Sequence, residues 1–145
     1  MRYLAKRVER ICDELYRLRI VQRIPLTDLI CKKGTYIRPE AADAATPPWT
    51  SFDSRTMHWY GPDEHYWFRT EFTVPKALNG KAMWLNVRTQ IEGDDGKNPQ
   101  FLLFVNNVPV QGMDMNHRDV LLSPKPISGE KLVFDLQAYS GTIHN

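Results

Sequence analysis

The stretch FLLFVNNVPVQ, Phe101–Gln111, constrains the fold more than any other part of the chain. Apolar residues occupy both alternating series of Phe101–Val105, so the strand predicted here would be covered on both of its faces. Asn106 and Asn107 follow directly, and asparagine tolerates the positive φ values of a two-residue hairpin turn. The pattern therefore predicts a central strand of a packed sheet, joined by a tight turn to an antiparallel partner over Val108–Gln111.

Three more segments alternate as strands do. In Tyr66–Pro75, one side would carry Tyr66, Phe68, Phe72 and Val74 and the other Trp67, Arg69, Glu71 and Thr73. Lys81–Gln90 would point Met83, Leu85 and Val87 inward, and Lys131–Tyr139 would do the same with Leu132, Phe134 and Leu136. The turn at Leu78–Gly80 suggests that the first two segments form one antiparallel ribbon. Short strands, frequent turns and a single helix predict a mainly β, antiparallel β-sandwich.

The predicted helix runs from Arg2 to about Gln22, where the chain has no glycine or proline. Leu4, Val8, Ile11, Leu15 and Leu18 recur at spacings of four and three, which places them along one helical face. Burial of this face would contribute ~1.5–3 kcal/mol per side chain, so the helix is expected to dock on an apolar surface. Two surfaces fit the pattern: the sheet of this domain, and a coiled-coil or other partner helix.

The segment Tyr36–Pro62, before the first predicted strand, is expected to be irregular. Residues 36–62 are rich in Ala, Pro, Thr and Ser and show no periodicity. Trp49 and Trp59 are costly to leave in water, so this segment is expected to pack over the sandwich. The same two aromatic side chains are also candidates for a sugar-stacking platform. We expect residues 1–24 to form the amphipathic helix and residues 25–145 one β-sandwich domain.

Composition excludes several classes of function. The formal net charge is only +2, with basic residues scattered outside the helix, which does not favour nucleic-acid binding. The two cysteines, Cys12 and Cys31, are far from a metal-binding or redox spacing, and the start MRYLAKRVER lacks the apolar core of a signal peptide. No run approaches the ~20 apolar residues of a membrane span. These observations predict a cytoplasmic protein with no membrane or nucleic-acid partner.

The sequence shows no catalytic constellation and no metal site. The adjacent carboxylates Asp63 with Glu64 and Asp94 with Asp95 are typical of solvated turns, although oxygen-rich loops also suit a structural calcium ion. The histidines stand apart, without zinc-ligand spacing: His58, His65, His117 and His144. No nucleophile elbow, phosphate-binding loop or dinucleotide fingerprint occurs. No catalytic and no metal-ligating residue is therefore assigned.

One polar run has no evident role in packing. Asn116, His117, Arg118 and Asp119 directly precede the apolar Leu121 and Leu122. Such side chains suit a solvated loop, and they equally suit the recognition of a neighbouring domain or of sugar hydroxyl groups. The candidate contact residues for an inter-domain or sugar interface are Gln111, Asp114, Asn116, His117 and Arg118.

Three of these segments together resemble a known enzyme domain. They are YWFRTEFTVP, then IEGDDGKNPQFLLFVNNVPVQGMDMNHRDVLL, then GEKLVFDLQAYSG. They are similar to the amino-terminal sandwich domain of glycoside hydrolase family 38 α-mannosidases, closest to the bacterial cytoplasmic branch. The resemblance covers about Trp59–Gly141, and it is most specific at Asn98–Phe101 and in the series from Gln111 to Arg118. Asn107 departs from the glycine common in that turn. The resemblance implies a jelly-roll sandwich like that of galactose-binding domains.

It also implies a parent enzyme that removes α-linked mannose with retention, using a zinc ion and an aspartate nucleophile on a following barrel. The His-x-Asp zinc motif of the family lies beyond this chain, so the chain itself is expected to be non-catalytic and without cofactor. Its expected partners are the downstream catalytic domain, mannose-containing oligosaccharides through the parent, and a possible second copy of the parent. Two alternatives remain: a free-standing carbohydrate-binding module, and an interaction module of an unrelated assembly.

Overall fold

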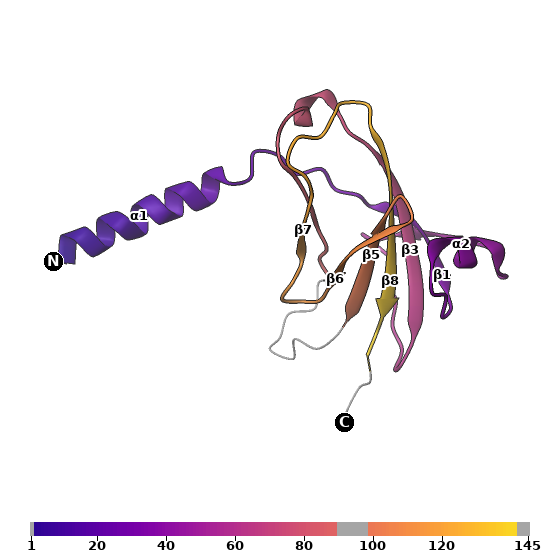
Figure 1. The fold of residues 1–145 in the computed structure, drawn as a ribbon. Helices are drawn as coiled ribbons and strands as arrows, with labels where there is room; N and C mark the ends of the chain where they lie inside the picture. Colours follow the sequence, from indigo (N-terminus) through magenta and orange to yellow (C-terminus); the bar gives the residue numbers. More distant parts are fainter. Residues whose placement is uncertain (1, 90–98, 142–145) are drawn as a thin grey trace.

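A computed structural model describes residues 2–89 and 99–141. Its elements in chain order are α1 (Arg2–Leu18), β1 (Asp28–Lys33), α2 (Pro39–Ala44), β2 (Thr50–Asp53), β3 (His65–Thr73), the 3-10 turn η1 (Lys76–Leu78), β4 (Met83–Asn86), β5 (Gln100–Val105), β6 (Val108–Met113), β7 (Asp119–Ser123) and β8 (Lys131–Tyr139). One sheet has the strand order β2-β1-β3-β8-β5-β6 and a second pairs β4 with β7 (Figure 1). All pairs are antiparallel, which confirms the mainly β, antiparallel prediction.

The main core lies between the two sheets. Side chains that alternate along the interior strands β3, β5 and β8 supply more than half of it, as the period of two in their sequences predicts. The buried members are Phe52, Phe68, Val74, Met83, Phe101, Leu103, Met113, Val120, Leu132, Phe134 and Ala138. Leu85, Val87 and Leu122 from the second sheet pack against them. The inward series predicted for Tyr66–Pro75 is therefore confirmed.

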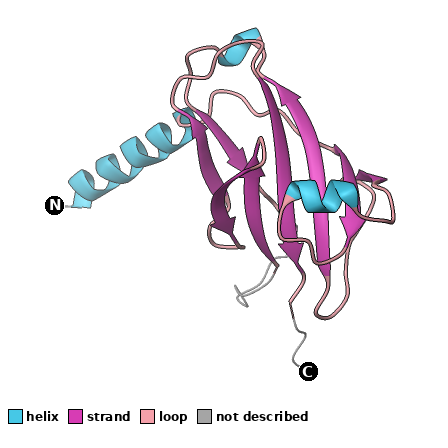
Figure 2. Cartoon of the chain, turned by 45° about the vertical axis from the view of Figure 1, so that its right-hand side comes forward, coloured by secondary structure: helices cyan, strands magenta, loops and turns pink. Residues whose placement is uncertain are grey.

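The opposite face of the six-stranded sheet is covered by α2 and the chain around it (Figure 2). Trp67, Phe104 and Ala42 are buried there, with Trp49 and Leu102 partly buried beside them. Strand β5 thus buries apolar side chains on both faces, as its double apolar series predicts. It lies between β8 and β6, so it is an interior strand.

The hairpin turn between β5 and β6 also follows the sequence. Asn106 and Asn107 have φ values of 49° and 66°, the left-handed conformation that a two-residue hairpin turn requires. The Asn106 side-chain oxygen accepts a hydrogen bond from the backbone N–H of Val133 at 2.9 Å. The turn is thereby tied to strand β8, next in the sheet.

Two predictions about the strands were wrong. The segments Tyr66–Pro75 and Lys81–Gln90 do not form a ribbon, because β3 pairs with β1 and β8 while β4 pairs with β7. Both segments carry an apolar inner face, and the turn η1 leads the chain to the other layer, so the two strands lie in different sheets. The segment 36–62 is not wholly irregular either, because it contains α2 and β2. Pro39 occupies the first turn of α2, where its missing N–H is tolerated.

Helix α1 extends away from both sheets (Figure 1). It ends at Leu18, four residues before the predicted end at Gln22, and its apolar residues are exposed: Leu4, Val8, Ile11, Leu15 and Leu18. Docking on the sheet of the same chain, one of the two surfaces considered, is therefore not observed. One face of the large sheet packs on β4 and β7, and α2 lies against the other. Among the described residues, no helix has the length and apolar character needed to cross a membrane.

Candidate functional site on the outer face of strands β4 and β7

The second sheet turns an apolar pair toward solvent. Trp84 on β4 lies opposite Leu121 on β7, and both side chains point away from the core. Trp84 is 59% exposed and Leu121 44% exposed. An exposed tryptophan next to an exposed leucine on a regular sheet is the kind of surface that marks a binding site.

A polar row adjoins this pair. Asn86 lies opposite Asp119, and its amide donates a hydrogen bond of 2.9 Å to the Asp119 carboxylate. The Nε of Arg88 donates to the side-chain oxygen of Asn86 at 3.1 Å, and the amide of Gln111 reaches the backbone oxygen of Asp119 at 3.5 Å. We call Trp84, Leu121, Asn86 and Asp119 together the β4–β7 outer face. It combines an apolar centre with an ordered polar border.

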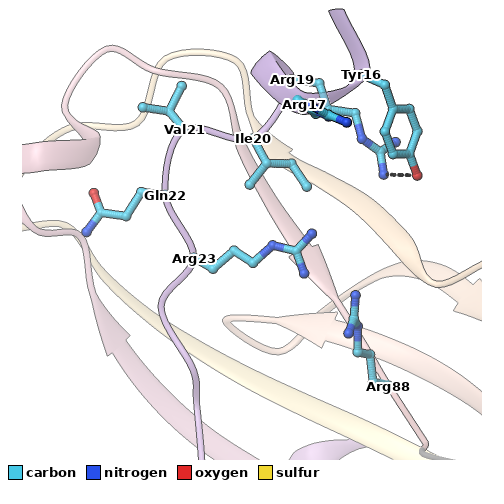
Figure 3. A pocket seen from close by; sticks show the side chains of 8 residues that line it. All are labelled: Tyr16, Arg17, Arg19, Ile20, Val21, Gln22, Arg23 and Arg88. Atoms are coloured by element: carbon cyan, nitrogen blue, oxygen red, sulfur yellow. Dashed lines mark hydrogen bonds between the residues drawn. The ribbon is translucent and has the colours of Figure 1, made fainter. Parts of the chain in front are cut away.

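A basic hollow of about 470 Å³ lies next to the border. Its lining comes from the end of α1, from the segment that follows and from one residue after β4: Tyr16, Arg17, Arg19, Ile20, Val21, Gln22, Arg23 and Arg88. Figure 3 shows the guanidinium groups of Arg23 and Arg88 extending into the same space. Four of these eight residues are arginines and, within 2–89 and 99–141, no acidic residue lines the hollow, so the described lining is basic. Arg88 belongs to both the hollow and the polar border.

The polar loop predicted as a contact site is held by its own hydrogen bonds. The Asp114 carboxylate accepts the backbone N–H groups of Asn116 at 2.8 Å and of His117 at 2.7 Å, and it meets the His117 ring Nδ1 at 3.0 Å. These hydrogen bonds lower the pKa of Asp114 below its ordinary value, and the bond from the His117 backbone N–H contributes most. The Nε of Arg118 donates to the carbonyl of Met115. Four of the five candidate residues lie in this loop: Asp114, Asn116, His117 and Arg118. The fifth, Gln111, lies on β6, and its amide reaches the backbone oxygen of Asp119.

We expect Asp114→Ala to lower the melting temperature of the chain at pH 7. A carboxyl group whose folded-state pKa is depressed contributes stability above its unfolded pKa of about 3.9 and loses it as the pH falls through the folded value. The difference between Asp114→Ala and the parent should therefore shrink below pH 4. Scanning calorimetry at pH 7 and pH 3 measures it, with Glu130→Ala as the exposed-carboxylate control. If Asp114→Ala and the parent chain melted at the same temperature at pH 7, the Asp114 hydrogen bonds would not stabilise the fold.

The two loop tryptophans are on opposite sides of the large sheet. Trp59 meets Tyr66, Phe68 and Phe101 edge to face, with ring centroids 5.4, 5.5 and 6.0 Å away, so it belongs to the main core. Trp49 packs with the cluster beneath α2. The structure therefore does not bring them together as a common platform, and it confirms that the loop packs over the sheet.

Beneath α2, Trp49 covers a buried charged cluster. Asp135 is 0% exposed and accepts the Nε of Arg69 at 2.6 Å, while Arg69 reaches Asp43 at 2.7 Å. Burial raises the pKa of Asp135, and Arg69 partly offsets this. Lys32, also buried, donates to backbone carbonyls at the end of α2. The Arg69 guanidinium stacks 4.7 Å from the Trp49 ring. The cluster is closed to solvent at Asp135 and open at Asp43, and it links α2 to the sheet.

The carboxylates considered for calcium have protein partners where the structure describes them. Asp63 accepts the Tyr139 hydroxyl at 2.9 Å, and Glu64 pairs with Lys33 at 2.7 Å. Asp94 and Asp95 lie outside the described residues. Within 2–89 and 99–141, no three His, Cys, Asp or Glu residues form a group able to hold a metal ion.

Comparison with known proteins adds no further constraint. No family model, curated protein or solved structure matches the chain. The β4–β7 outer face is therefore interpreted from its own chemistry. Trp84 was missed at the sequence level, although the inward alternation of Met83, Leu85 and Val87 already turns it outward. A tryptophan at a solvent-facing strand position is the signal that could have identified it.

Proposed function

We propose that this chain is the non-catalytic amino-terminal domain of a cytoplasmic α-mannosidase, a jelly-roll sandwich related to galactose-binding domains. In the proposal, its β4–β7 outer face packs against the zinc-dependent catalytic barrel that follows in the parent chain. The observation that carries the docking role is the exposed Trp84–Leu121 pair with its ordered polar border. The resemblance of the three segments to family 38 enzymes supports the enzyme class.

The chemistry of the face suits a domain interface. Tryptophan is prominent among residues that dominate binding energy, and such residues sit centrally within a border that excludes water. Trp84 and Leu121 form that centre here, and Asn86 with Asp119 borders it. Arg88 and the basic hollow adjoin the border, so the complementary surface on the barrel should be apolar in the middle and acidic at one side.

The catalytic groups belong to the barrel in this proposal. Retaining hydrolysis needs a nucleophile and an acid/base residue on either side of the glycosidic bond, and a zinc ion would orient the sugar hydroxyl groups. The described residues of this chain offer no ligand set that fits zinc. In the proposal, the domain positions and stabilises the catalytic domain.

The coding sequence beyond Asn145 provides the first test, because the proposal requires it to continue into a barrel with a His-x-Asp motif. In that full-length enzyme, we expect Trp84→Ser with Leu121→Asp to separate the two domains. Loss of an interface centre costs about 2 kcal/mol or more, roughly 30-fold in the docking equilibrium. Calorimetry should then show two transitions in place of one, and turnover of an aryl α-mannoside should fall.

The matched control is Ile37→Asp, which places the same charge on an exposed side chain next to α2, on the opposite layer. It should leave both readouts unchanged. A coding sequence that stops at Asn145 would contradict the enzyme assignment. Full-length enzyme in which the double variant still unfolds in one transition at the parent temperature would contradict the docking face.

A free-standing carbohydrate-binding module is the second candidate, and Trp84 is the observation that favours it. An exposed indole beside the amide of Asn86 and the guanidinium of Arg88 offers a stacking surface with hydrogen-bonding groups. Titration of the chain with mannose and manno-oligosaccharides separates the two candidates. Docking requires no change in tryptophan fluorescence up to millimolar sugar. A saturating change that Trp84→Phe abolishes would favour the module.

A further inference from the structure

Helix α1 carries an apolar stripe that the described residues leave uncovered. Leu4, Val8, Ile11, Leu15 and Leu18 are separated by four, three, four and three residues, the spacing of the two apolar positions of a heptad repeat. Each of these side chains is between 52% and 73% exposed. A helix that packs on a sheet presents a wider apolar face, whereas this narrow stripe has the form of a coiled-coil seam.

The residues that flank the seam have a complementary charge pattern. Glu14 lies on one side of the stripe, and Arg19, five residues later and directly after the end of the helix, lies on the other. Five residues is the separation at which flanking side chains meet across two parallel helices in register. Arg7 would face the uncharged Cys12 in the same arrangement, so no like charges meet. Glu14 pairs with Arg10, and Arg19 donates to the Tyr16 hydroxyl at 2.8 Å and stacks on its ring. Both contacts are exposed and easily exchanged.

We propose that α1 is a self-association element that forms a parallel two-stranded coiled coil with α1 of a second copy of this chain. The seam buries the five apolar side chains of each helix, and Glu14 of each copy pairs with Arg19 of the other. Val8 and Leu15 occupy one seam position, with Leu4, Ile11 and Leu18 at the other, a pattern compatible with two strands. The inference concerns the oligomeric state alone and does not rest on the proposed enzyme function.

The geometry of the chain permits this pairing. Figure 1 shows α1 leading away from the sheets, with its amino terminus distant from them, so a second helix can approach along its length. The seam from Leu4 to Leu18 is only about 21 Å long at 1.5 Å per residue. Such a short coil associates weakly, and we expect a dissociation constant of about 10–100 µM.

Sedimentation equilibrium of the whole chain, from about 1 µM to about 500 µM, tests the proposal. The weight-average mass should rise from that of a monomer toward that of a dimer across this range. Ile11→Ser on the seam should weaken association at least about tenfold, since it removes a buried side chain from each helix. Asp13→Ser introduces the same residue on the outer side of the helix and should leave association unchanged. Because α1 stands apart from the sheets, Ile11→Ser should also leave the melting temperature of the β domain unchanged.

The charged pair gives an independent test of orientation. Glu14→Arg and Arg19→Glu should each weaken association on their own, because each sets like charges opposite one another. An equimolar mixture of the two variants should associate as the parent does, because every pair is then again opposite in charge. A chain that stays monomeric at 500 µM would overturn the proposal. An unaffected Arg19→Glu beside a weakened Glu14→Arg would overturn the parallel arrangement, since antiparallel helices would pair Glu14 with Arg7.

Discussion

Arg69→Ala is expected to lower the free energy of unfolding at pH 7 by about 3 kcal/mol. The substitution leaves the carboxylate of Asp135, which is 0% exposed, without the guanidinium that compensates its charge. Removal of one partner of a buried ion pair typically costs about 3–5 kcal/mol, because the remaining charge stays desolvated. The second oxygen of Asp135 already has no hydrogen-bond partner among the described residues.

The loss should depend on pH in a defined direction. Burial raises the folded-state pKa of Asp135, and removal of Arg69 raises it further. A group with a raised folded-state pKa contributes its full stability below the unfolded value, about 3.9, and loses it as the pH rises through the folded value. Below that unfolded value, Asp135 is neutral in both states. The difference between Arg69→Ala and the parent should therefore shrink steadily from pH 7 to pH 4.

Urea denaturation at pH 7, 5.5 and 4 measures both the size and the pH dependence. The matched control is Arg55→Ala, which removes an arginine from an exposed pair with Asp53 and should change stability little at any of these pH values. If Arg69→Ala were as mild as Arg55→Ala, the cluster beneath α2 would not stabilise the fold. A loss that did not vary with pH would exclude Asp135 as the group responsible.

Trp67→Ala is the second large effect that we expect, a loss of about 3–5 kcal/mol in the free energy of unfolding. Trp67 is fully buried, stacks near Phe104 with ring centroids 5.5 Å apart and fills the layer between the sheet and α2. Its indole N–H has no hydrogen-bond partner among the described residues. Trp67→Phe should therefore cost distinctly less than alanine, since phenylalanine retains most of the packing and removes an unsatisfied donor.

The comparison with Trp84 makes this test specific. Trp84→Ala removes the same side chain from an exposed position and should change the stability of the isolated chain by less than about 1 kcal/mol. Urea denaturation of the three variants, monitored by circular dichroism so that tryptophan loss does not affect the signal, gives the ranking. Similar losses for Trp67→Ala and Trp84→Ala would show that the layer beneath α2 is not a packed core.

The sequence patterns correctly predicted those features of the fold that depend only on residues close together in the chain. The alternation in Phe101–Val105 and the Asn106–Asn107 turn depend on neighbouring residues only, and both were found as predicted. The partner of β4 depends on contacts far along the chain, so local alternation identified the strand and not its sheet. Strands β1 and β2 are short and each offers few inward apolar residues, which is why the pattern there was too weak to identify them.

The functional and structural sites also differ in how far nearby sequence could predict them. The alternation placed Arg69 on the same side of its strand as Trp67, but its partner Asp135 is 66 residues away and meets it only through the β3–β8 register. The run around His117 was recognised as unusual, yet its hydrogen bonds to Asp114 depend on a turn that residue types alone do not specify. Trp84 could have been found, because its outward direction follows directly from its neighbours.

The strand order has a consequence for how the protein is made. Strand β8 follows the other seven described strands in the sequence, and it lies between β3 and β5 in the middle of the large sheet. Until it emerges, the chain holds two separate ribbons, β2-β1-β3 and β5-β6, with unpaired inner edges. Translation must therefore reach the end of β8 before the large sheet can close, and until then the nascent domain carries open strand edges.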